Sequence, residues 1–110
     1  MAVKPDPSPE VGANVKAELA NIANGRINAA LYTPEFAAQL TPTLPQQKAG
    51  IAPLGPVQNV EYVGDSRQGL ERVAYYRVKF RDVTLYAIVC LTRDGRIRLW
   101  GITPNTTIEG

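Results

Sequence analysis

The spacing of apolar residues changes at Pro56, and this change constrains the fold more than any other feature of the sequence. Before Pro56, apolar residues recur at intervals of three and four, as on one face of an α-helix. After Pro56 they alternate with polar residues, as in a half-buried β-strand. The 110 residues amount to a single domain's length. We therefore expect an α+β fold, with an N-terminal helix and short helices packed on an antiparallel sheet.

Prolines and capping residues divide the first half into three expected helices. Pro9 follows Ser8, a favoured N-cap, and this first helix is expected to end at Gly25 as its C-cap. Its apolar face carries Val11, Val15, Leu19 and Ile22. Thr33-Pro34-Glu35 repeats the start signal and predicts a short helix through Leu40. A third helix is expected from Leu44 to Ala52, before Pro53.

The second half predicts a four-stranded meander. The expected strands are Val57–Gly64, Leu70–Phe80, Val83–Thr92 and a last strand from Arg96 to about Pro104. A loop over Asp65–Gly69 joins the first two strands, and Arg81-Asp82 forms a tight turn. Arg93-Asp94-Gly95 predicts a hairpin with Gly95 left-handed, which pairs Thr92 with Arg96. In that register Ile97 and Leu99 face the helices.

Chain organisation follows from these elements. We expect a proline-rich linker over residues 1–9, one domain over residues 10–104 and a loose tail over residues 105–110. The net charge of +2 and the dispersed basic residues predict no nucleic-acid partner. No apolar run has the length of a membrane span, so no membrane partner is expected.

Catalytic signatures are absent from the sequence. The chain contains no histidine, which removes the commonest general base and metal ligand. No glycine-rich phosphate loop is present, and the single Cys90 is expected to be an inert core thiol. Glu61 faces outward in the predicted register, although a slip of one residue would turn it inward. We therefore predict no cofactor, no metal and no enzymatic activity, with a pocket enzyme using an unrecognised acid as the remaining alternative.

The order of elements and a dispersed set of residues resemble small bacterial domains of the cystatin-like, nuclear transport factor two-like superfamily. The residues that carry this likeness are Leu19, Gly25, Thr33–Phe36, Leu54–Pro56, Val60, Tyr76–Val78 and Asp94–Ile97. More narrowly, the chain is similar to accessory modules of exported serine hydrolases. The resemblance implies a curved sheet around the long helix, frequent dimers through the outer sheet face, and, with the proline-rich start, a periplasmic or secreted location.

One face of the predicted sheet is expected to be covered by a partner. An aromatic and aliphatic centre with an arginine rim is typical of protein interfaces. The residues assigned to this surface are Tyr75, Arg77, Tyr86, Ile88, Arg98, Trp100 and Ile102. The alternatives are that a terminal segment covers the face or that the register differs. The sequence thus predicts a non-catalytic accessory domain, associating with a second copy or a neighbouring domain of the same polypeptide.

A second candidate site lies between the first helix and the sheet. Aromatic residues there could line a mostly apolar pocket for a small molecule, with hydroxyl groups at its mouth. They are Tyr32, Phe36, Tyr62, Tyr76 and Phe80. The alternative interpretation of these residues is ordinary core.

Overall fold

The computed structural model describes residues 5–69 and 71–104. Helices come first and strands follow, which confirms the α+β class. The helical elements are α1 (Pro9–Ala23), η1 (Ala29–Leu31), α2 (Pro34–Leu40), η2 (Thr41–Thr43), α3 (Leu44–Ile51) and η3 (Ala52–Leu54). The strands are β1 (Asn59–Gln68), β2 (Glu71–Lys79), β3 (Thr84–Leu91) and β4 (Ile97–Thr103).

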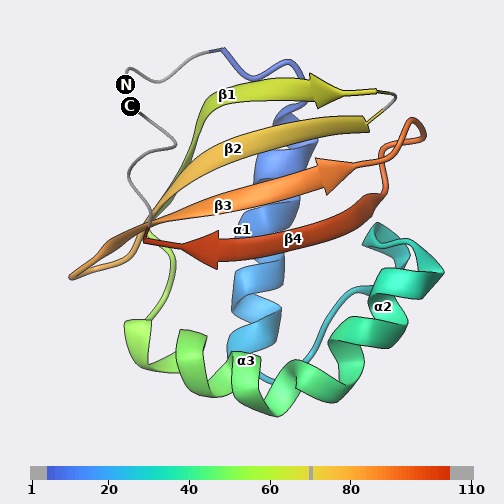
Figure 1. The fold of residues 1–110 in the computed structure, drawn as a ribbon. Helices are drawn as coiled ribbons and strands as arrows, with labels where there is room; N and C mark the ends of the chain where they lie inside the picture. The colour runs from blue at the N-terminus through green and yellow to red at the C-terminus, as the bar shows by residue number, and fades with distance from the viewer. Residues whose placement is uncertain (1–4, 70, 105–110) are drawn as a thin grey trace.

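The four strands form one antiparallel sheet in the order β1-β2-β3-β4, which confirms the predicted meander. In the central register Tyr76 pairs with Ala87, and Val78 pairs with Leu85. These side chains face α1, which crosses behind the sheet in Figure 1. Throughout, the face turned toward α1 is called the inner face and the opposite one the outer face.

Helix α1 buries the apolar stripe that its spacing predicts. Val15, Leu19 and Ile22 are at most 3% exposed. The helix ends at Ala23, with Asn24 at the C-cap and Gly25 one residue beyond it. Ser8 occupies the predicted N-cap position but makes no side-chain cap. Its hydroxyl instead accepts a hydrogen bond from Arg72 Nη1, at 3.0 Å.

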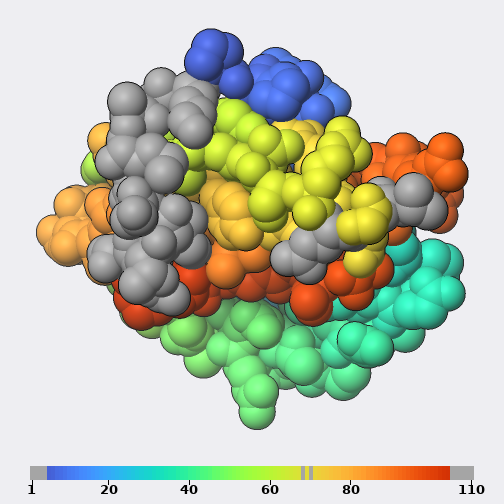
Figure 2. All heavy atoms as spheres, turned by 45° about the horizontal axis from the view of Figure 1, so that its top comes forward, coloured from blue at the N-terminus to red at the C-terminus, as the bar shows by residue number. Residues whose placement is uncertain are grey.

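Helices α2 and α3 form an arc along the β4 side of the sheet (Figures 1 and 2). Thr33 caps α2 as predicted, because its hydroxyl accepts a hydrogen bond from the Phe36 amide at 3.3 Å. Helix α2 buries Phe36 and Leu40. By contrast, α3 has no fully buried residue. The core is therefore closed mainly by α1, and α3 is only loosely seated on it.

A bulge in β1 corrects the predicted loop over residues 65–69. The pairing with β2 shifts between Tyr62 and Gly64, after which the strand continues to Gln68. A bulge lets a strand bend and continue instead of ending. Asp65 consequently pairs with Ala74 on the inner face rather than lying in a turn.

A second bulge, in β4, corrects the predicted faces of that strand. The hairpin itself is as expected, because Thr92 N donates to Arg96 O at 2.9 Å and Gly95 has a φ of 86°. Arg98 is then an extra residue, since Leu91 pairs with Ile97 but Cys90 pairs with Leu99. An extra residue reverses the alternation that follows it. Trp100 and Ile102 therefore lie on the inner face, and Leu99 lies on the outer one, 45% exposed.

The residues before α1 are part of the packed domain from Pro5 onward. Asp6 accepts hydrogen bonds from the Ser8 amide at 2.8 Å and from the Tyr76 hydroxyl at 3.4 Å. The predicted linker over residues 1–9 thus ends in a segment that contacts the inner face of β2. Residues 1–4 and the predicted tail over residues 105–110 lie outside the described residues.

Candidate functional site

The outer face carries five of the seven residues predicted as an interaction surface. On this face, Tyr75 of β2 lies opposite Ile88 of β3, and Arg77 of β2 lies opposite Tyr86 of β3. Arg98 joins them through its ion pair with Glu71. Trp100 and Ile102 lie on the inner face because of the bulge in β4, so their predicted place in this surface was wrong, while Tyr75 and Tyr86 remain on it.

The predicted outward position of Glu61 is confirmed by its pairing with Arg77. Its carboxylate forms ion pairs with Arg77 and with Lys79, each at 3.2 Å. A carboxylate held between two cations and away from the inner face has no enclosed space in which to take a proton from a ligand. The Glu61 enzyme alternative therefore finds no support in this geometry.

The five aromatic residues predicted as a pocket are all buried, and most contribute to the core rather than to a cavity. They form two separate edge-to-face pairs. The ring centroids of Tyr32 and Phe36 are 5.5 Å apart, and those of Tyr62 and Tyr76 are 5.7 Å apart. Phe80 lines a cavity of about 400 Å³, and in the described part of the chain none of the other four aromatic residues lines that cavity, so the five do not share it.

An apolar cavity of about 360 Å³ instead lies between α3 and the inner face of β3 and β4. We call it the α3 cavity. Its apolar walls come from the helices and from the two strands at that end of the sheet. They comprise Leu19, Ile22, Leu40, Ile51, Leu54, Leu85, Trp100 and Ile102. The polar part of the lining is supplied by Gln46 and Gln47 from α3. A volume of this size is typical of small-molecule sites, and polar atoms make up a substantial part of this cavity's lining beside its apolar walls.

Half-buried side chains distinguish this cavity from the core. Ile51, Leu54, Leu85, Trp100 and Ile102 all pack against the buried cluster without being fully covered. A second cavity of about 400 Å³ lies on the other side of α3 and shares Leu19 and Ile51 with the first. These two side chains therefore separate the two spaces.

A buried carboxylate lies close behind the α3 cavity. Glu18 is 1% exposed, and it accepts hydrogen bonds from the Tyr32 hydroxyl, from Asn21 Nδ2 at 2.8 Å and from the Asn28 amide at 2.9 Å. Burial, and then the bond to Glu18, raises the pKa of Tyr32 above its ordinary value, while the neighbouring Trp100 acts in the opposite direction. The three donors hold this carboxylate in place and satisfy its charge.

Sequence reasoning missed Glu18, although a signal was present. Glu18 lies three residues after Val15 and four before Ile22, which places it within the apolar stripe of α1. An acid in such a stripe must find buried donors, because an unpaired buried charge is very costly. Asn21 lies in α1 itself, but Asn28 and Tyr32 lie in the segment after the helix, which has no regular apolar pattern, so these two donors could not be named from the sequence.

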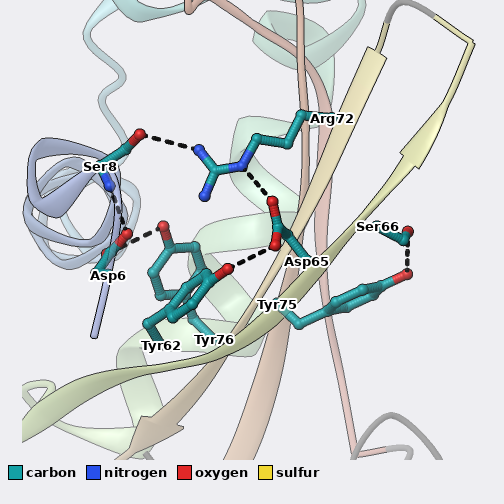
Figure 3. Close-up of polar contacts among 8 residues, drawn as sticks. All are labelled: Asp6, Ser8, Tyr62, Asp65, Ser66, Arg72, Tyr75 and Tyr76. Atoms are coloured by element: carbon teal, nitrogen blue, oxygen red, sulfur yellow. Dashed lines mark hydrogen bonds and ion pairs between the residues drawn. The ribbon is translucent and has the colours of Figure 1, made fainter. Parts of the chain in front are cut away.

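A polar cluster joins the start of α1 to β1 and β2 (Figure 3). At its centre, Arg72 donates from Nε to Asp65 Oδ2 at 2.7 Å and from Nη1 to the Ser8 hydroxyl. Tyr62 donates to the other Asp65 oxygen at 2.7 Å. Arg72 Nη2 is buried and has no hydrogen-bond partner within the described part of the chain.

The charges of this cluster shift its ionisations in consistent directions. The hydrogen bond from Tyr62, and then that from Arg72, lowers the pKa of Asp65. Burial and the bond to Asp65 raise the pKa of Tyr62. Burial raises the pKa of Tyr76, and the charge of Asp6 adds to this. The cluster therefore keeps Asp65 ionised and both tyrosines neutral near pH 7.

Other features add no catalytic chemistry in the described residues. Cys90 is a half-buried free thiol on the outer face, where it pairs with Val73 and Leu99. Over residues 5–69 and 71–104, no three side chains of the metal-binding types gather at one place. None of the helices in these ranges combines the length and apolar character that crossing a membrane requires.

Comparison of the chain with models of known protein families, with curated proteins and with solved structures gives no match. The resemblance to the cystatin-like, nuclear transport factor two-like superfamily therefore rests on the sequence pattern and stays a prediction.

Proposed function

We propose that this chain is a non-catalytic binding domain that takes a small, mostly apolar molecule into the α3 cavity. The observation that carries the proposal is the apolar space of about 360 Å³ beneath a helix that has no fully buried residue. When a ligand covers apolar surface beneath a loosely seated helix, that surface is removed from water and the free energy of the system falls, which favours binding.

The lining supports a ligand of one or two rings with a single polar group. Trp100 and Ile102 supply apolar surface from the sheet, and Leu54 supplies it from the helical side. The amides of Gln46 and Gln47 supply hydrogen-bond donors and acceptors that could orient one polar substituent. None of the described residues that line this cavity is charged, which favours a neutral ligand.

The burial and hydrogen bonding of Glu18 accord with binding that involves no catalysis. Glu18 accepts three hydrogen bonds from the protein and is almost completely buried. A general base must reach the proton that it removes. A carboxylate that is already saturated and enclosed fits a structural role better.

The α3 cavity also fits the observations better than association through the outer face does. The predicted association relied on Trp100 and Ile102 as well as on Tyr75 and Tyr86, and the first two side chains belong to the cavity wall. An accessory role beside a neighbouring domain, as the sequence resemblance implies, is compatible with a ligand-binding cavity. We therefore keep binding as the proposed function and the outer-face association as a prediction of the sequence.

The chain's only tryptophan provides the test, because Trp100 lines the cavity. The neutral fluorescent probe N-phenyl-1-naphthylamine accepts energy from an excited indole when the two are close. We expect saturable energy transfer from Trp100 to this probe and its reversal by a neutral competitor such as decanol. A linear, non-saturating signal in the folded protein would contradict the proposal.

Two substitutions on the same strand make matched variants. Ile102→Gln places an amide in the cavity wall and should weaken probe binding about tenfold or more, because it introduces a polar group that must be desolvated. Leu99→Gln makes the same change on the outer face and should leave binding unchanged. Leu85→Gln repeats the cavity change from β3 in case Ile102→Gln impairs folding. Equal effects of the cavity and outer-face variants would exclude the α3 cavity as the site.

A further inference from the structure

A basic cavity lies at the opposite end of α1 from α3, beside the polar cluster of Figure 3. Its volume is about 340 Å³. Side chains from the start of α1, from β1 and β2, and from the β3–β4 turn contribute to its lining. They include Ser8, Asn14, Arg67, Arg72 and Arg93. We call this space the arginine cavity.

Two of the three arginines are exposed side chains, and the charge of Arg67 also acts on Asp65, whose pKa it helps to lower. Arg67 and Arg93 take part in no ion pair or side-chain hydrogen bond within residues 5–69 and 71–104. Arg72 is bound to Asp65, and its Nη2 is buried beside Tyr62, so that atom is closed to a ligand in the cavity. Glu10 also lines the cavity, and it offsets only part of this positive charge.

The polar side chains that line the cavity come from different elements of the fold. Arg67 and Arg72 face each other as a pair across β1 and β2, while Arg93 comes from the turn after β3. Asn14 adds an amide from α1 that has no side-chain bond in the described ranges. The α1 N-terminus carries a partial positive charge, and no side chain caps it. Donors that come from different elements suit a tetrahedral anion, because guanidinium groups bind phosphate oxygens in pairs.

We propose that the arginine cavity binds the phosphate group of a phosphorylated small molecule. The site is independent of the α3 cavity, so it would give the domain a second ligand. Arg67 and Arg93 supply the binding charge. Arg72 is a positioning residue, because Asp65 and Ser8 hold its guanidinium at the cavity wall.

The test is a titration of the full chain with sodium pyrophosphate at constant ionic strength, followed by amide chemical shifts. We expect saturable shifts confined to residues around Asn14, Arg72 and Gly95. The double variant Arg67→Gln/Arg93→Gln should bind about a hundredfold more weakly, since each of the two lost charged hydrogen bonds costs about tenfold. Leaving Arg72 in place preserves the ion pair with Asp65 and hence the fold.

A control variant removes the same number of charges elsewhere. Arg26→Gln/Arg81→Gln changes two exposed arginines outside the cavity, and it should bind pyrophosphate within about twofold of the wild type. Equal weakening in the two double variants would show general charge attraction and overturn the proposal. Shifts spread over many arginines, or full competition by chloride at the same ionic strength, would overturn it as well.

A lipid headgroup carries the same phosphate group, and a second arm separates the two sources. Phosphatidylcholine vesicles with and without phosphatidic acid are sedimented with the protein. If a free small molecule is the ligand, no fraction should sediment while pyrophosphate binds. Sedimentation that requires phosphatidic acid and is lost in Arg67→Gln/Arg93→Gln would exclude the free molecule and assign the phosphate to a membrane lipid.

Discussion

The Tyr32 hydroxyl donates a hydrogen bond to the buried carboxylate of Glu18, and this contact ties the segment after α1 to the buried face of that helix. The same carboxylate accepts the Asn28 amide at 2.9 Å. A single acid in the apolar stripe of α1 thus determines where the chain goes after the helix ends.

Tyr32→Phe should lower the free energy of unfolding by about 1–3 kcal/mol, because it leaves a buried carboxylate short of one donor. Glu18→Gln should have a similar effect. The double variant should lose less than the sum, since both changes remove the same contact. Urea unfolding of the four proteins measures this. Strict additivity would mean that the contact contributes nothing to stability.

Tyr32 also predicts a dependence on alkaline pH. Burial raises the pKa of its hydroxyl above the ordinary value of 10.0. A group with a raised pKa in the folded state stabilises the fold fully below its unfolded pKa and loses that contribution as the pH rises above it. The unfolding free energy should therefore fall above pH 10, and Tyr32→Phe should make the fall shallower. An unchanged slope in the variant would contradict the buried position.

Truncation of two neighbouring residues on β4 should lower the free energy of unfolding by different amounts. Trp100→Ala should cost about 2–3 kcal/mol of stability, somewhat below the value for a fully buried tryptophan. Leu99→Ala should cost about 1 kcal/mol or less, because nearly half of its surface is in solvent. Chemical unfolding followed by circular dichroism measures the loss of stability in each of the two variants. The reverse order would restore the faces that the sequence predicts.

Asp65→Asn should lower stability at pH 7 by about 0.5–1 kcal/mol, since solvent screens a partly exposed pair. The pKa of Asp65 lies below its ordinary value of 3.8. Its contribution is therefore complete above that value and disappears as the pH falls through the lowered pKa. The difference between variant and wild type should vanish in acid. Asp82→Asn, in an exposed pair with Arg81, should be neutral at both pH values.

Two glycine-to-alanine substitutions should differ in sign. Gly50 lies in α3, and a Cβ there would meet no atom within 4 Å, so Gly50→Ala should stabilise by about 0.5–1 kcal/mol. Gly25 has a φ of 75°, which an L-residue adopts only at a cost, so Gly25→Ala should destabilise by about 1–2 kcal/mol. Thermal unfolding provides both values. Destabilisation by Gly50→Ala would mean that α3 is seated more tightly than described.

Much of the fold could be predicted because it depends on local patterns. Pro9, Pro34 and Leu44 begin helices in the structure as they do in the prediction. The Thr92–Arg96 turn also follows from its own few residues. The candidate cavities could not be predicted in the same way. They depend on which face each strand turns toward α1, and one extra residue changes that.

The amino-acid sequence alone determined the class of fold, the order of the elements and the absence of histidine chemistry, because periodicity, caps and composition are properties of neighbouring residues. Only the tertiary structure decided that Trp100 lines a cavity, that Glu18 is a buried anchor and that Arg67 faces Arg72. Bulges at Val63 and Arg98 form where strands must bend to pair and pack. That bending follows from contacts between distant segments, which no short stretch of sequence contains.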